Sequence, residues 1–139
     1  MDITVSFSSG KRVDAHFEGF TVKTDQPPAL GGAGAEAAPY ELFLASMATC
    51  AGIFALGFCQ ARGLSTEGLS LVQHNTFDPV SHLVTEVRYT LTLPNTFPEK
   101  YRGAIVKAVE NCKVKKSLAQ PPTFAVTVAP SPDTLGDQV

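Results

Sequence analysis

An uninterrupted run of uncharged residues constrains this chain more than any other feature. From Leu42 to Cys59 there are eighteen residues without Asp, Glu, Lys or Arg, a length that would allow a membrane span. The run also contains Ser, Thr and Gly, has little Leu or Ile bulk, and lies between amphipathic segments, so a buried helix is favoured. We therefore predict one long helix over residues 39–62, with Pro39 suited to its first turn.

A helix that is apolar on all sides needs cover on all sides. A chain of 139 residues has little material with which to surround it. We therefore expect a second subunit to cover one side of the helix, which makes a homodimer the predicted assembly.

The composition is that of an ordinary globular domain. Hydrophobic residues make up 44% and charged residues 17% of the sequence, which excludes intrinsic disorder as its general character. The net charge of -2 gives no reason to expect binding to nucleic acid or to an anionic membrane. We expect one domain over residues 1–130, followed by a polar tail over residues 131–139.

The cysteines indicate free thiols. There are three cysteines, so they cannot all be paired in disulfides within one chain. The first residues show no basic region followed by an apolar run, so no secretory signal is predicted. We expect a cytoplasmic, reducing environment, in which catalysis or redox sensing is a more common use of cysteine than a structural disulfide.

Alternating apolar residues predict strands before the long helix. Ile3, Val5 and Phe7 form one such pattern, the next runs from Val13 to Phe17, and a third strand continues through 20–22. Residues 24–38 then form a Pro/Gly/Ala-rich loop, of a length that is usually functional or mobile.

The pattern after the helix predicts strands near 68–77 and over 81–93, a second helix and a last strand. On the second of these strands an apolar face alternates with a polar one, and the apolar face comprises Leu83, Val87, Tyr89, Leu91 and Leu93. Thr96 and Glu99 have capping-box spacing at the start of the second helix. Cys112 falls at or just past the end of that helix, on its apolar side. The last strand is predicted over 123–128, and the element order indicates an α+β domain.

Two segments resemble a known family. Residues 39–50, Pro-Tyr-Glu-Leu-Phe-Leu-Ala-Ser-Met-Ala-Thr-Cys, are similar to the Pro-x-Glu-Leu-Leu-x-Ala-Ser-x-x-x-Cys segment that opens the central helix of OsmC/Ohr proteins. Residues 112–118, Cys-Lys-Val-Lys-Lys-Ser-Leu, are similar to the Cys-x-Val-x-x-x-Leu segment of the same family. Their separation of 62 residues also suits the family. The resemblance implies an OsmC-like fold, with antiparallel sheets around a long buried central helix in an intertwined homodimer.

The resemblance implies a peroxidase that acts on organic hydroperoxides in oxidative-stress defence. Carried over by position, Cys50 is the peroxidatic thiol and Cys112 is the resolving thiol. Cys50 would become a sulfenic acid, and Cys112 would condense with it to a disulfide that an external dithiol reduces. No cofactor and no metal are expected.

Two catalytic groups of the family have imperfect counterparts. Ohr-type enzymes place a glutamate ten residues before the reactive cysteine, whereas here that position is Tyr40 and Glu41 stands one later. Glu41 is therefore a candidate catalytic residue, or else a first-turn residue favoured by the helix dipole. Arg12 is the N-terminal candidate for the family's arginine, or else a solvated strand residue. Lysines near Cys112 could supply a cation instead, or form a solvated helix end, and they are Lys107, Lys113, Lys115 and Lys116.

Other readings remain open. Cys59 is nine residues from Cys50, which places the two on opposite faces of one helix, so Cys59 is interpreted as a core residue. His16, His74 and His82 are expected on strand surfaces without metal-ligand spacing. The chain could instead be a dimer that acts as a thiol-based sensor or binds a small apolar ligand. A thiol-dependent acyl transferase or hydrolase would need a histidine base near Cys50.

Overall fold

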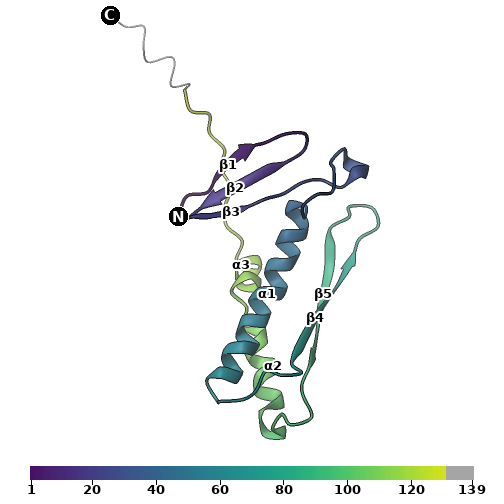
Figure 1. Ribbon diagram of the computed structural model, residues 1–139, viewed down its shortest axis with the longest axis vertical. Coiled ribbons are helices and arrows are strands. Elements are labelled where there is room, and N and C mark those ends of the chain that lie inside the picture. Colours follow the sequence, from purple (N-terminus) through teal and green to yellow (C-terminus); the bar gives the residue numbers. More distant parts are fainter. Residues whose placement is uncertain (131–139) are drawn as a thin grey trace, which may run out of the picture.

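The computed structural model describes residues 1–130 and shows an α+β arrangement built along one long helix (Figure 1). The strands are β1 (Thr4–Phe7), β2 (Val13–Phe17), β3 (Phe20–Val22), β4 (Ser70–Phe77) and β5 (Val84–Thr92). The helices are η1 (Pro28–Leu30), α1 (Pro39–Gln60), η2 (Glu99–Tyr101), α2 (Arg102–Glu110) and α3 (Lys113–Ala119). The predicted long helix, the first five strands and the α+β class are confirmed.

Helix α1 is the centre of the larger part of the fold. Its buried side chains recur at steps of three and four residues, so one face of the helix is covered. Helices α2 and α3 and the β4–β5 hairpin pack against α1. The core cluster combines α1 with α2 and the segment before it: Ala51, Ala55, Phe58, Cys59, Phe97, Ile105 and Val109.

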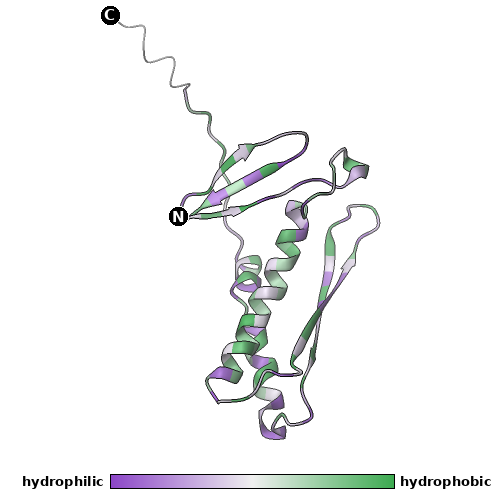
Figure 2. Ribbon diagram, viewed as in Figure 1, coloured by the Kyte–Doolittle hydropathy of each residue, from purple (hydrophilic) through white to green (hydrophobic). Residues whose placement is uncertain are grey.

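The rest of α1 is apolar but uncovered within one chain. Figure 2 shows apolar residues along most of the helix. The helix is long and apolar enough to cross a membrane, yet only 28% of its apolar window is buried inside the chain. Ile53 is 59% exposed, and Ala45, Thr49 and Gly57, which lie on the same side of the helix at steps of four residues, are exposed too. The prediction that a single chain of this length leaves one side of the helix uncovered is therefore confirmed.

The N-terminal sheet has one apolar and one polar face. Strands β1, β2 and β3 pair antiparallel in that order, with Val5 opposite Ala15 and Ala15 opposite Val22. Residues that are directly opposite share a face, so the apolar side chains of all three strands lie together. On the other face, His16 is hydrogen-bonded to Ser6 and Thr21. The sheet has no extensive packing against any helix within residues 1–130.

Three details of the prediction are wrong. Residues 123–128 form no strand, because no strand in the described chain pairs with them, and Phe124, Val126 and Val128 are at least 90% exposed. The second helix has no capping box, since Pro98 stands at the cap position and offers no side-chain acceptor. His82 lies in a turn with a φ of 58°, so β5 begins at Val84 rather than at 81. The predicted tail, 131–139, lies outside the described residues.

Candidate thiol site

The fold brings Cys50 and Cys112 together. Cys50 lies in the middle of α1 and is partly exposed, whereas Cys112 is completely buried at the junction of α2 and α3. The sulfur of Cys112 lies 3.9 Å from the carbonyl oxygen of Met47, one helical turn before Cys50. The two thiols are also close enough for each to change the pKa of the other, since Cys112 lowers that of Cys50 and Cys50 raises that of Cys112. Both are free thiols.

The surroundings of Cys50 favour its thiolate. Burial, the largest single influence, opposes ionisation, yet the pKa of Cys50 is lowered overall. Hydrogen bonds from Cys112 and from the backbone amides of Val114 and Lys113 lower this pKa. These amides belong to the first turn of α3, where backbone N–H groups have no partner within a helix. The ammonium group of Lys115 adds a favourable charge interaction.

Cys112 has the opposite tendency. Burial raises the pKa of the Cys112 thiol, and its interaction with Cys50 raises it further. The pair therefore favours one thiolate, at Cys50, and one protonated thiol, at Cys112. That division suits a nucleophile with a hydrogen-bond donor beside it.

Tyr89 from β5 lies close to this pair. Burial raises the pKa of Tyr89, and the negative charges that Cys112 and Cys50 can carry raise it further. The ammonium of Lys115 lies 5.5 Å from the centre of the Tyr89 ring. Within the described part of the chain, the buried Tyr89 hydroxyl has no hydrogen-bond partner.

A cavity of about 640 Å³ adjoins the thiols. It lies between β5 and the three α-helices, and Met47, Tyr89 and Lys115 belong both to its wall and to the surroundings of the thiols. Its apolar wall is formed by Met47, Val87, Leu91, Val106, Val109 and Leu118, and its polar groups come from Arg88, Tyr89, Glu110 and Lys115. This size and lining suit a small organic molecule with one polar end.

Glu41 has a structural role at the start of α1. Its carboxylate accepts a hydrogen bond of 2.8 Å from the backbone N–H of Ala38. A carboxylate at this end of a helix is also favoured by the helix dipole. Nine residues along a helix span about 13 Å, so Glu41 acts on its own helix end rather than on Cys50 of the same chain.

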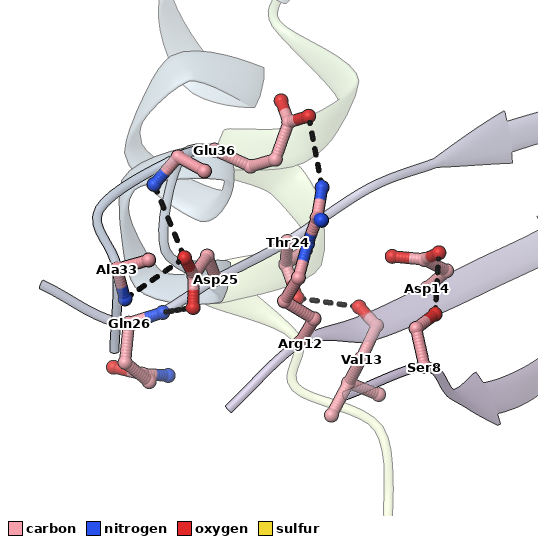
Figure 3. A network of polar contacts seen from close by, with 10 residues as sticks. Ser8, Arg12, Val13, Asp14, Thr24, Asp25, Gln26, Ala33 and Glu36 are labelled. Carbon is pink, nitrogen blue, oxygen red and sulfur yellow. Dashed lines mark hydrogen bonds and ion pairs between the residues drawn. The ribbon is translucent and has the colours of Figure 1, made fainter. Parts of the chain in front are cut away.

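Arg12 is held in the N-terminal part of the fold (Figure 3). It lies in the turn before β2, not within the strand, and its guanidinium pairs with Glu36 at 3.5 Å. Beside it, the buried carboxylate of Asp25 accepts backbone hydrogen bonds from Gln26, Ala33 and Ala35. Asp25 and the Arg12–Glu36 pair thus organise the 24–38 loop.

The remaining candidates lie outside the thiol site. Cys59 is fully buried in the core, where burial raises the pKa of its thiol. His16 is engaged on the polar face of the N-terminal sheet, and His74 lies on β4. Among residues 1–130, no group of three or more His, Cys, Asp or Glu side chains could hold a metal ion.

Comparison with known families identifies the chain. Residues 32–127 match the sequence model of the OsmC-like protein family. The chain belongs to the OsmC-like family. The match includes α1, both thiols, Tyr89 and Lys115. No curated protein matches the sequence.

Solved structures share the fold of this chain at low sequence identity. A proposed osmotic stress induced and detoxification response protein from Psychrobacter arcticus 273-4 is 19% identical, with a TM-score of 0.70 over 83% of this chain and 85% of that one. An OsmC-like protein from Mycoplasma pneumoniae is 16% identical, with a TM-score of 0.61 over 86% and 87%. The organic hydroperoxide resistance protein OsmC of Legionella pneumophila is 17% identical, with a TM-score of 0.54 over 85% and 89%.

Two parts of this OsmC-like site escaped sequence reasoning. The alternation of the strand places Tyr89 among the residues of its apolar face. Its hydroxyl, on a face otherwise made of Leu and Val residues, was the feature that could have marked it as functional. The amides at the start of α3 have no signature in the side-chain sequence, because they depend on where α2 ends.

Proposed function

We propose that the protein is a thiol-dependent peroxidase that reduces organic hydroperoxides. The observation that carries the proposal is the proximity of Cys50, whose pKa is lowered, to the buried Cys112, whose pKa is raised. Membership of the OsmC-like family supports it, and one fold relative is an organic hydroperoxide resistance protein. This pairing is what a two-thiol peroxidase requires, because a nucleophilic thiolate needs a second thiol within reach.

The proposed reaction has three steps. The Cys50 thiolate attacks the terminal oxygen of R–O–O–H, the O–O bond breaks, and the alkoxide leaves and is protonated to an alcohol. The sulfur of Cys112 then attacks the Cys50 sulfenic acid, which forms the disulfide and releases water. An external dithiol exchanges with this disulfide, restores both thiols and is itself oxidised to a disulfide.

The cavity supports an organic substrate. Its apolar wall would bind the R group of a bulky hydroperoxide, whereas hydrogen peroxide has no such group. The preference for organic hydroperoxides would therefore come from burial of the R group beside the thiols.

We propose that the working form is a homodimer in the cytoplasm. Large apolar surfaces are uncovered in one chain: the apolar face of the N-terminal sheet, the Ile53 side of α1, and the extended segment 121–130. Large exposed apolar surfaces on a soluble protein usually mark a site of interaction with another molecule. A second copy could cover these surfaces, and a strand from that copy could pair with residues 123–128.

Turnover of hydroperoxide by cysteine variants tests the proposal. The wild-type protein should consume an organic hydroperoxide in the presence of at least one of several dithiol reductants, and Cys50→Ser should abolish this activity. Cys112→Ser should react once and then over-oxidise at Cys50. Cys59→Ser is the matched control and should retain activity. Unchanged peroxide consumption by Cys50→Ser would rule out the proposed mechanism.

A thiol sensor or a binder of small apolar ligands is the second candidate function. The observation that favours it is the position of Arg12, whose ion pair is with Glu36 and not with a thiol. Titration of Cys50 separates the two functions. A pKa above about 9 would indicate a non-catalytic thiol, because the thiolate fraction at neutral pH would then be very small.

A further inference from the structure

The buried hydroxyl of Tyr89 lies near the two thiols and has no hydrogen-bond partner within residues 1–130. Buried polar groups in folded proteins are nearly always hydrogen-bonded. Within residues 1–130, the side-chain oxygens of Tyr89 and Gln73 are two of the few exceptions. These residues are directly opposite each other on β5 and β4, on the face that lies toward α1. The Tyr89 hydroxyl, which lies near the thiols, and the Gln73 side-chain carbonyl are therefore both free to hydrogen-bond another molecule.

Of these two groups, only Tyr89 can donate a proton. The free group of Gln73 is its carbonyl oxygen, since its amide nitrogen already donates to the Leu44 carbonyl and to Asn75. A hydroxyl, by contrast, both donates and accepts. Tyr89 also forms part of the cavity wall, where a bound molecule would lie.

We propose that Tyr89 is a catalytic proton donor to the leaving oxygen of the hydroperoxide. This inference rests on the proposed peroxidase function. As the Cys50 thiolate forms a bond to the terminal oxygen, the O–O bond breaks and its electron pair goes to the oxygen attached to R. The Tyr89 O–H hydrogen-bonds that oxygen and transfers its proton to it, which yields the alcohol. The phenolate then takes a proton from solvent.

The charges around Tyr89 suit this role. The pKa of Cys50 is lowered whereas burial and the thiols raise the pKa of Tyr89, so thiolate and protonated phenol coexist over a broad pH range. Pairs of groups whose pKa values are moved apart are typical of acid–base sites. The Lys115 ammonium, 5.5 Å from the Tyr89 ring centre, would stabilise the transient phenolate.

Reagents with different leaving groups test the inference. Tyr89→Phe keeps the ring and removes only the hydroxyl, and Tyr101→Phe is the matched control, because Tyr101 packs on Phe58 in the core. Each variant is reacted with tert-butyl hydroperoxide, with peracetic acid and with iodoacetamide at one pH. An alkoxide needs a proton as it leaves, whereas acetate and iodide do not.

Tyr89→Phe should react with tert-butyl hydroperoxide at least about tenfold more slowly than wild type, since general acids contribute about 10²–10⁴-fold. Its rates with peracetic acid and iodoacetamide should stay within about twofold of wild type, and Tyr101→Phe should match wild type with all three. An equal loss with every reagent, or no loss with any, overturns the role of Tyr89. A wild-type protein that reacts with iodoacetamide but with neither peroxide overturns the proposed function and this inference together.

Discussion

At the scale of single residues, the question is what activates Cys50. A cysteine in the middle of a helix gains little from the helix dipole, and burial raises the pKa of a thiol. In this protein the effect of burial on the pKa of Cys50 is offset by groups at and after the end of α2. These are the Cys112 thiol, two backbone amides of α3 and Lys115, and all of them favour the thiolate. The catalytic arginine expected from the family resemblance is therefore not needed to account for the lowered pKa of Cys50.

The lysine contribution can be measured directly. Lys115→Gln should raise the pKa of Cys50, because it removes a positive charge that favours the thiolate. At a pH below that pKa, alkylation of Cys50 by iodoacetamide should slow by the factor by which the thiolate fraction falls. The readout is the pH dependence of alkylation.

Lys116→Gln is the matched control, since it removes the adjacent lysine of the same helix. An equal shift of the Cys50 titration in both variants would mean that Lys115 has no specific effect. The sequence indicated a group of lysines around Cys112, but it could not say which of them acts, because that depends on the position of α3.

At the scale of elements, the 24–38 loop depends on Asp25. Three backbone amides donate to its buried carboxylate, and these hydrogen bonds, the Ala35 one first, lower the pKa of Asp25. Gly32 also packs directly on the backbone of Gln26, where a side chain would not fit. The sequence marks this segment only as a long loop, since hydrogen bonds from backbone amides leave no pattern in it.

Asp25→Asn should lower the melting temperature at neutral pH, because an amide can accept fewer of these hydrogen bonds and places its own N–H groups against them. The folded-state pKa of Asp25 lies below its unfolded value, so its stabilising effect is complete above about pH 4. The effect is lost as the pH falls through the folded-state pKa. The difference in melting temperature between variant and wild type should therefore narrow in acid, and a constant difference would contradict this account.

The elements show what the sequence could and could not predict. Helix α1 and strands β1, β2 and β5 were predictable, because the uncharged run and the alternation in these strands are strong local signals, whereas β4 was predicted from Leu69 and Leu71. The wrong strand at 123–128 has the same alternation but no partner within the described chain. A strand needs a neighbour, and that is a property of the assembly, not of the local sequence.

At the scale of the whole molecule, the uncovered surfaces predict self-association. Sedimentation velocity should show a dimer at micromolar concentration. Val126→Asp places a charge in the exposed apolar segment 121–130 and should shift the protein toward monomer, if a second copy covers that segment. Val80→Asp, in the β4–β5 turn, is the control and should remain dimeric. A wild-type monomer at all concentrations would contradict the proposed assembly.

We propose that Cys50 and Cys112 form one redox unit. Peptide mapping under non-reducing conditions, after one equivalent of an organic hydroperoxide, tests it most directly. Cleavage after Phe54 or Phe58 separates Cys50 from Cys59, so each cysteine can be followed separately. We predict a peptide pair joined by a Cys50–Cys112 disulfide, with Cys59 still a free thiol. Oxidation of Cys50 to a sulfinic acid while Cys112 stays free would contradict it, and so would no reaction at either thiol.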